Sequence, residues 1–267
     1  MRRQLFGEAE VIVADSQRHG GELAAAELAE QLRAQVARTG SAAVILATGN
    51  SQVAFIEALR VRTDVPWSQT TIFHMDEYIG LSADHPANFR RYIRDELTDR
   101  VRPAAFHELN GDATDLDEEM RRYGRLLEAA APVVCVLGIG ENGHLAFNDP
   151  PADFSAAEPL HRVRLADTAR QQQVNEGHFA VLSDVPLYAM TLTIPTLLKP
   201  GRVLAIVPER RKAEVVRTAL QGPISPECPA SILRQTHGVT IYLDPDSSSL
   251  LELDGSMVAT VAESGAV

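Results

Sequence analysis

Three short polar segments contain the residue types that could carry out chemistry, and each directly follows a run of apolar residues. The first is Thr48-Gly49-Asn50-Ser51, in which the glycine has unusual backbone freedom and Asn or Ser can cap a helix. Because exposed N–H groups at the start of a helix attract anions, this turn could hold a phosphate group. An ordinary strand-to-helix turn with a capping serine would have the same sequence.

The second segment is the pair of carboxylates Asp76-Glu77, which follows the apolar run 70–74. Two neighbouring carboxylates could act as a general base and its partner, or they could coordinate a metal ion. The alternative is an acidic turn whose side chains are solvated and have no chemical role.

The third segment, residues 137–150, reads LGIGENGHLAFNDP and is the most unusual of the three. Its glycines bring the backbone close to other groups, and Asn142, His144 and Asp149 could converge there. Histidine transfers protons near neutral pH, and a carboxylate can orient it. A dinucleotide site would need Gly-x-Gly-x-x-Gly near the first strand with an acidic residue about 20 positions later, and a zinc site would need further His or Cys ligands near His144. Neither pattern is present.

These segments need elements that position them, and the sequence alternates between short β-branched runs and longer amphipathic stretches. We expect strands at 11–14, 43–47, 70–74, 133–137, 188–192, 203–207 and 239–243. We expect helices at 21–37, 51–60, 88–100, 116–130 and 211–221. In the first helix, Leu23, Ala26, Leu28, Leu32 and Val36 have the spacing of a buried face.

Strands that are apolar throughout and alternate with helices are typical of a doubly wound, mostly parallel α/β sheet with helices on both faces. In such Rossmann-like folds, ligands bind at the carboxyl ends of the strands, which is where the three polar segments lie. We expect a single domain over residues 1–267, with a peripheral tail from about residue 245.

Composition excludes several classes of protein. The 267 residues have a formal net charge of −11, which disfavours general binding to nucleic acid or to an anionic membrane. No apolar stretch approaches the roughly 20 residues of a membrane span, and the charged start does not resemble a signal peptide. We therefore expect a cytoplasmic protein. Lys199 and Lys212 are the only lysines in the chain. A lysine that is retained near a polar segment could therefore have a specific role there.

Taken together, the segments resemble the glucosamine-6-phosphate deaminase family of the 6-phosphogluconolactonase-like superfamily. Residues 73–78 (FHMDEY) and 138–150 resemble its two signatures, 46–51 resemble its phosphate loop, and 207–213 resemble a later turn that carries a lysine. Order and spacing match from about residue 10 to residue 243. The resemblance implies conversion of an amino-sugar 6-phosphate, most simply glucosamine 6-phosphate, to fructose 6-phosphate and ammonia in amino-sugar catabolism, without a metal or redox cofactor.

The resemblance also implies roles for individual residues. Asp76 would move the proton between C2 and C1, His144 would open the sugar ring, and Asn142 and Asp149 would support His144. The residues expected to bind the substrate or its phosphate are Thr48, Gly49, Asn50, Ser51, Glu77, Arg170 and Lys212.

Three positions depart from the family's pattern. Asn142 stands where many members have Asp, and Asp149 stands where Glu is commoner. The arginine that contacts phosphate in well-known members has no clean counterpart, and Arg170 is the nearest candidate.

Two alternatives stay open at this stage. One is a 6-phosphogluconolactonase-type hydrolase, which would need only a histidine base. The other is a non-catalytic sugar-phosphate sensor, which would usually carry a DNA-binding segment. We expect a small-molecule amino-sugar phosphate as the partner, without nucleic acid or membrane, and leave a homo-oligomer open.

Overall fold

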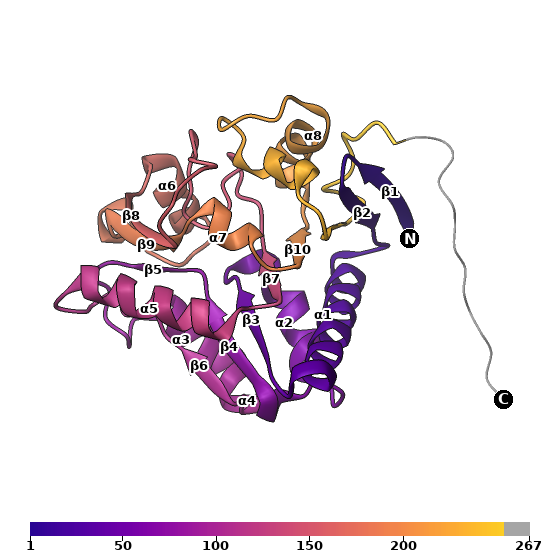
Figure 1. Cartoon of the computed structure of the whole chain (residues 1–267). Helices are drawn as coiled ribbons and strands as arrows, with labels where there is room; N and C mark the ends of the chain where they lie inside the picture. The colour runs from indigo at the N-terminus through magenta and orange to yellow at the C-terminus, as the bar shows by residue number, and fades with distance from the viewer. Residues whose placement is uncertain (254–267) are drawn as a thin grey trace.

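A computed structural model describes residues 1–253 of the chain and contains a central sheet of eight strands (Figure 1). Its strands are β1 (Arg2–Phe6), β2 (Ala9–Val13), β3 (Ala42–Leu46), β4 (Thr70–His74), β6 (Ala105–His107), β7 (Val134–Leu137), β10 (Arg202–Val207) and β11 (Val239–Leu243). Their spatial order is β1-β2-β11-β10-β7-β3-β4-β6. Every neighbouring pair is parallel except β1 and β2, which confirms the expected mostly parallel sheet.

The direction of winding reverses between β3 and β7. From β3 the chain continues outward through β4 to β6, and it then returns to add β7, β10 and β11 on the other side. Leu46 pairs with Val136, so the carboxyl ends of the two strands lie side by side. Loops that diverge from such neighbouring strands leave a crevice between them, and this crevice is where open α/β sheets bind ligands.

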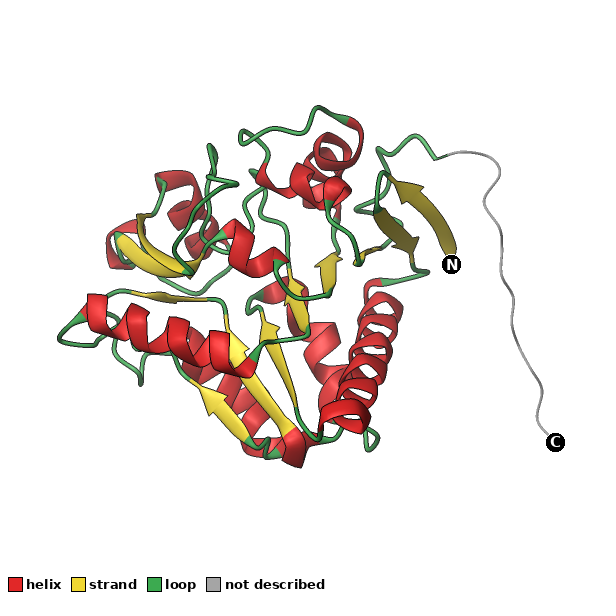
Figure 2. Cartoon of the chain, in the orientation of Figure 1, coloured by secondary structure: helices red, strands yellow, loops and turns green. Residues whose placement is uncertain are grey.

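Helices cover both faces of the sheet. They are α1 (Gln17–Thr39), α2 (Val53–Arg60), α3 (Phe89–Ile93), α4 (Asp99–Val101), α5 (Leu116–Ala130), α6 (Asp167–Asn175), α7 (Ile194–Leu198) and α8 (Ala213–Gln221). Apolar residues of α1 and α2 pack on one face, and those of α5, α7 and α8 pack on the other. Figure 2, in the same orientation as Figure 1, shows α1 and α5 on opposite sides of the strands.

Short helical turns complete the connections between these elements. They are η1 (Asn50–Gln52), η2 (Trp67–Gln69), the π-helical turn η3 (Arg94–Thr98), η4 (Leu182–Asp184), η5 (Arg210–Lys212) and η6 (Pro229–Gln235). Turns η1 and η5 each follow a central strand and lead into a helix, and α3, η3 and α4 form one continuous helical run.

A second, antiparallel sheet is built from β5 (Asp76–Tyr78), β8 (Leu160–Arg164) and β9 (Tyr188–Leu192). The strand expected at 188–192 therefore exists, but it belongs to this small sheet and not to the central one. Strands β1, β5, β6 and β8 and helices α6 and α7 were not predicted from the sequence. Most of them are short, and β5 and α6 are strongly polar, so neither an apolar run nor a helical period marks them.

One further expectation, the buried face of α1, needs correction. On α1, Leu28 and Leu32 are buried as predicted, whereas Leu23, Ala26 and Val36 are only partly buried. The rest of the buried face consists of small residues such as Gly21 and Ala25. A side chain at Gly21 would collide with the backbone of Ala54, 2.7 Å away, so close packing of α1 on α2 requires glycine there. The described part of the segment that begins at about residue 245 is mixed in burial: Ser247 is completely buried, whereas Pro245, Asp246 and Ser249 are exposed. Residues 254–267 of the expected tail lie outside the described residues. Among residues 1–253, no helix is long and apolar enough to cross a membrane.

Candidate active site

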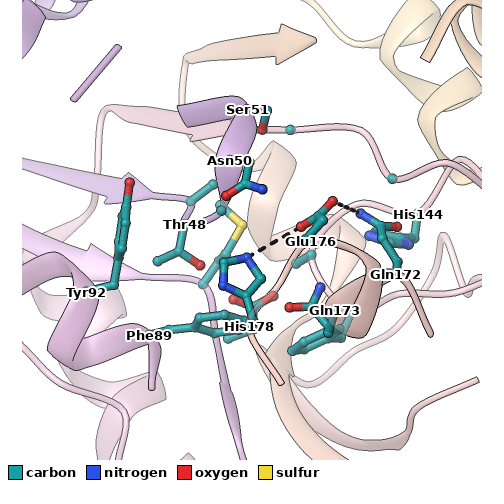
Figure 3. A pocket seen from close by; sticks show the side chains of 18 of the residues that line it. Thr48, Asn50, Ser51, Phe89, Tyr92, His144, Gln172, Gln173, Glu176 and His178 are labelled. Carbon is teal, nitrogen blue, oxygen red and sulfur yellow. Dashed lines mark hydrogen bonds and ion pairs between the residues drawn. The ribbon is translucent and has the colours of Figure 1, made fainter. Parts of the chain in front are cut away.

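A cavity of about 890 Å³, open to solvent, lies at the carboxyl ends of β3 and β7. Its wall includes the loops that follow β3, β4, β7 and β10, together with part of α3 and the end of α6. In Figure 3, Thr48, Asn50 and Ser51 lie on one side of this cavity, His144 and Gln172 lie on another, and His178 and Glu176 lie between them.

The turn after β3 lines the cavity with Thr48, Gly49, Asn50 and Ser51. Gly49 has a φ of 96°, a conformation that favours glycine, and η1 starts at the next residue. The Gln52 side chain donates a hydrogen bond to Ser51 Oγ at 2.9 Å, so the hydroxyl proton of Ser51 remains available to a ligand. A side chain at Gly138 would crowd that hydroxyl at 3.0 Å. Backbone and hydroxyl donors thus face the cavity from this turn.

Lys212 lies on the cavity wall at the end of η5, and only 4% of its surface is exposed. Within the described residues, no hydrogen bond or ion pair engages its ammonium group. Burial, and then the charge of Arg211, lower the pKa of Lys212. The charges of Glu141, Glu176 and Glu209 oppose that shift. An ammonium group on a largely buried side chain that no carboxylate contacts directly is costly, and an anionic ligand would reduce that cost.

Asp76 reaches the cavity from the first position of β5, two residues after β4 ends. It is 7% exposed, and burial, followed by the charge of Glu77, raises its pKa to about 8. The preceding His74 is completely buried and accepts a hydrogen bond from the backbone N–H of Leu109 at 2.8 Å, which anchors the end of β4. A carboxylate that is short of hydrogen-bond donors and screened from water is a strong base.

Glu77 does not line the cavity, contrary to its expected role in binding substrate. Side chains that are adjacent on a strand point to opposite faces, and the carboxylate of Glu77 lies in the interior behind Asp76. It accepts hydrogen bonds from the backbone N–H groups of Tyr78, Phe89 and Arg90 at 2.9, 3.3 and 3.0 Å. Neither carboxylate belongs to a solvated turn.

His144 lies on the cavity wall in the loop after β7, and Gly140 makes room for its ring. A Cβ atom at Gly140 would lie 2.2–2.3 Å from three atoms of the imidazole, so the ring packs directly on the glycine backbone. The loop is closed by backbone bonds from Gly140 to the His144 carbonyl and from Gly143 to the Gly140 carbonyl, both at 3.0 Å.

Asn142 and Asp149 do not line the main cavity, and they contact His144 from behind. Asn142 Nδ2 donates to Asp149 Oδ1 at 2.9 Å, and Asn142 Oδ1 lies 2.8 Å from His144 Nδ1. Because an ionised carboxylate can only accept, the amide must direct its oxygen toward the histidine. His144 Nδ1 therefore carries a proton in the neutral ring, which leaves the Nε2 lone pair free. Although burial opposes it, hydrogen bonds from His144 and Asn142 lower the pKa of Asp149.

Arg170 is not brought to the cavity. Its guanidinium donates to the carbonyls of Leu182 and Val185 at 2.6 and 3.0 Å and pairs with Asp167 at 3.0 Å. With 7% of its surface exposed, this side chain ties α6 to η4. It is a structural arginine, not the phosphate contact for which it was the nearest candidate.

Sequence reasoning missed the residues that α6 and the following turn place on the cavity wall, namely Gln172, Gln173, Glu176 and His178. Burial opposes ionisation of Glu176, but hydrogen bonds from His178, Gln172 and Arg211 lower its pKa to about 2. Arg211 also lines the cavity and pairs with Glu176, Glu209 and Glu141 at 2.7, 2.7 and 2.9 Å. Only Arg211 had a signal in the sequence, because it directly precedes Lys212, a candidate phosphate contact.

The arrangement supplies donors for an anion at one part of the cavity and two proton-transfer groups, Asp76 and His144, at others. In a doubly wound α/β protein, a site of this kind at the point where the strand order reverses is suited to bind a small anionic molecule. Residues 16–242 match the family described as glucosamine-6-phosphate isomerases/6-phosphogluconolactonase, and the chain belongs to that family.

Two relatives are similar to most of this chain. A glucosamine-6-phosphate deaminase of Exiguobacterium sibiricum is 36% identical over 206 residues, which are 77% of this chain and 80% of that protein. The corresponding enzyme of Pseudarthrobacter chlorophenolicus is 34% identical over 250 residues, covering 91% and 93% of the two chains.

Solved structures agree in fold. A monomeric glucosamine-6-phosphate deaminase superposes with a TM-score of 0.82 at 30% identity and covers 90% of this chain and 99% of its own. The 6-phosphogluconolactonase of Trypanosoma brucei has a TM-score of 0.75 at 16% identity, over 90% and 98% of the chains, and shares the fold.

Proposed function

We propose that this protein is a glucosamine-6-phosphate deaminase that converts glucosamine 6-phosphate and water to fructose 6-phosphate and ammonia. The observation that carries the proposal is that Asp76 and His144 line one cavity together with Lys212 and the turn after β3. Lactone hydrolysis needs one base, whereas deamination needs proton transfer at the ring and at carbon. The relatives at 36% and 34% identity are deaminases, which favours the same reaction.

The substrate's phosphate binds to Lys212 and to the donors of the turn after β3. The buried ammonium supplies charge, and the backbone N–H groups and the Ser51 hydroxyl supply directed hydrogen bonds. Because phosphate is remote from C1 and C2, these contacts hold the ground state and the transition state alike.

Ring opening is assigned to His144. Its Nε2 takes the proton of the C1 hydroxyl and delivers a proton to the ring oxygen, while the bond between C1 and that oxygen breaks and the C1 aldehyde forms. During this step the imidazole becomes transiently positive. Asn142 Oδ1 then receives a stronger hydrogen bond from Nδ1, and Asp149 provides the nearby negative charge, 3.3 Å from Nδ1.

Carbon chemistry is assigned to Asp76. The ionised carboxylate removes the C2 proton, the electron pair moves toward C1, and the C1 oxygen takes up a proton from the substrate's own ammonium group to give a neutral enolamine. Asp76 returns its proton to C1, which leaves a protonated imine at C2. Water then adds to C2, its protons pass to the nitrogen, and the C–N bond breaks as the ketone forms, so that the nitrogen leaves as ammonium, the protonated form of ammonia. Burial raises the pKa of Asp76 to about 8, which suits a group that must both accept and return a proton near neutral pH.

Ammonia release tests this function. Chelator-treated protein is incubated with glucosamine 6-phosphate or galactosamine 6-phosphate, and ammonia and ketose phosphate are quantified, with Asp76→Asn as the inactive control. We expect equal amounts of both products from the glucosamine substrate. If neither amino sugar yields ammonia while 6-phosphogluconolactone is hydrolysed, the deaminase proposal is wrong.

A further inference from the structure

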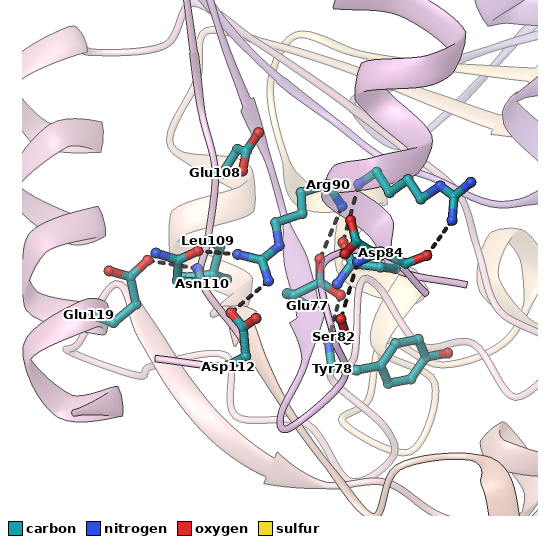
Figure 4. A network of polar contacts seen from close by, with 12 residues as sticks. Glu77, Tyr78, Ser82, Asp84, Arg90, Glu108, Leu109, Asn110, Asp112 and Glu119 are labelled. Carbon is teal, nitrogen blue, oxygen red and sulfur yellow. Dashed lines mark hydrogen bonds and ion pairs between the residues drawn. The ribbon is translucent and has the colours of Figure 1, made fainter. Parts of the chain in front are cut away.

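Glu77 is the immediate neighbour of Asp76 on β5, and it is completely buried on the side of the strand away from the cavity. Figure 4 shows its carboxylate beside the backbone of Arg90 at the start of α3. Removing a carboxylate from water costs free energy unless hydrogen-bond donors replace the lost water, so a buried acid of this kind requires such donors.

Three backbone N–H groups provide this compensation. Those of Phe89 and Arg90 belong to the first turn of α3, and that of Tyr78 belongs to Glu77's own strand. The third N–H of the helix, from Arg91, is capped by the side chain of Asn88 at 3.2 Å. Glu77 thus satisfies donors at a helix start that would otherwise be buried without partners. Burial raises the pKa of Glu77 to about 7, and the hydrogen bonds from Arg90, Tyr78 and Phe89, which lower it, offset only part of that effect.

The same contacts link the base to the opposite part of the cavity wall. Helix α3 contributes Phe89 to the cavity, and Tyr92 follows one turn later. Gly111 packs closely on this strand, since a Cβ atom there would lie 1.9 Å from the carbonyl oxygen of Tyr78 and 3.0 Å from Cγ of Glu77. Strand β5, which carries Asp76, and the start of α3 are therefore held as one unit.

Several other charged groups surround this pair. The guanidinium of Arg90 is directed to Asn110 and to Asp112, the latter at 2.6 Å, and not to Glu77. Burial lowers the pKa of His74 to about 3, so the imidazole below Asp76 is neutral. Other charged groups near β5, α3 or the cavity include Arg91, Arg94, Asp95, Glu108, Glu119, Glu176, Arg211 and Lys212. Glu77 is the acid adjacent to the base, and its charge is the second cause, after burial, that raises the pKa of Asp76.

We infer that Glu77 is a positioning residue for carbon proton transfer: through its hydrogen bonds from Phe89 and Arg90 it fastens the strand that carries Asp76 to the start of α3, with its carboxyl group directly behind the base. This inference rests on the proposed deaminase function. It predicts two separable effects, one of the charge on the basicity of Asp76 and one of the hydrogen bonds on the placement of Asp76.

Glu77→Gln and Glu77→Asp separate these effects. The glutamine keeps the length and removes the charge, so the acid limb of the kcat/KM profile should move to lower pH by roughly one unit, a tenfold change in the ionisation constant of Asp76. The aspartate keeps the charge but cannot reach all three N–H groups, so the limb should stay in place while kcat falls at least tenfold. Glu128→Gln, which removes an exposed charge from α5, is the matched control and should change neither quantity.

A measurement without substrate distinguishes failure of this inference from failure of the deaminase assignment. The carboxylic acid stretch of Asp76 is followed by infrared difference spectroscopy as pH is varied, in the parent protein and in Glu77→Gln, each compared with its own Asp76→Asn variant. A lower titration midpoint in Glu77→Gln supports the inference even if the parent enzyme releases no ammonia. An unchanged midpoint overturns the effect of charge.

Stability is checked by thermal melts. If Glu77→Gln does not fold, Glu77→Asp decides the question, since normal kcat and KM in that variant would overturn the positioning role. A tenfold or larger loss of kcat with an unmoved acid limb would support it.

Discussion

Removing the Asn142 amide tests how the histidine is held. In Asn142→Ala, His144 loses the acceptor 2.8 Å from its Nδ1 and a second contact from its backbone N–H at 3.1 Å. Asp149 loses the donor 2.9 Å from its Oδ1. The fold should survive, because the backbone bonds between Gly140, Gly143 and His144 that close the loop do not involve the Asn142 side chain.

The size of the effect follows from the charge that His144 acquires. In ring opening the bond from Nδ1 becomes one from a cationic donor, worth about 1.5–3 kcal/mol, or about 10- to 150-fold in rate. Asp149 Oδ1 already lies 3.3 Å from Nδ1, so a small movement lets the carboxylate replace the lost acceptor. We therefore expect a loss near the lower end, about tenfold.

The assay compares two substrates. Initial rates of ammonia release are measured with cyclic glucosamine 6-phosphate and with a 5-deoxy analogue that cannot close a pyranose ring. Asn142→Ala should lose about tenfold with the cyclic substrate and less than about twofold with the analogue. His144→Gln should show the same pattern with a loss of at least about 100-fold.

Asn142→Asp is the matched control, because it keeps an oxygen acceptor next to Nδ1 and should retain most of the cyclic rate. Equal losses on both substrates for Asn142→Ala and His144→Gln would refute the ring-opening assignment. An undiminished cyclic rate in Asn142→Ala would refute the proposed support by the amide.

Three other substitutions probe separate parts of the site. Asp76→Asn should reduce turnover by about 10²–10⁴-fold on cyclic and acyclic substrates alike. Burial raises the pKa of Asp76 to about 8 in the folded state, so the parent protein loses stability as pH rises from about 4 toward 8 and this carboxyl group must ionise. Asparagine does not ionise, so thermal melts should show that Asp76→Asn raises the melting temperature relative to the parent more at pH 8 than at pH 5. Lys212→Ala should raise KM about 10- to 150-fold with a smaller change in kcat, and steady-state kinetics with an unchanged KM would count against a phosphate contact. Gly140→Ala should resemble His144→Gln in the two-substrate assay, since its methyl group would occupy the space of the imidazole, whereas normal rates would mean that the ring position is not critical.

The central sheet could be predicted from sequence because its strands are buried on both faces and are therefore apolar throughout. The runs 43–47 and 203–207 carry this pattern and correspond to β3 and β10. The second sheet has no such mark. Strand β5 reads DEY, and only its pairing with β9 reveals it as a strand. Its formation depends on contacts more than 100 residues apart, which a local pattern does not contain.

The cavity's location was predictable for the same reason, since polar residues directly after buried strands collect at one edge of a parallel sheet. The direction of individual side chains was not. Asp76 and Glu77 are neighbours in sequence, but a strand sends them to opposite faces, so only one reaches the cavity. Arg170 lies on the polar helix α6, which has no apolar periodicity, and Glu176 directly follows that helix. Their orientations depend on tertiary contacts with η4 and Arg211.

The insertion of β7 between β3 and β10 has a consequence for how the protein reaches its active form. Leu46 pairs with Val136, and Val203 pairs with Cys135, so the middle strand joins parts of the chain that are made early and late in synthesis. Contacts of such long sequence separation form slowly, because much of the chain must be ordered before they are gained. The turn after β3 and the turn before α8 come together only when β7 and β10 are both in place. A fragment that lacks either strand cannot assemble the cavity, so ligand binding reports that the centre of the sheet, from β10 through β7 and β3 to β4, has formed.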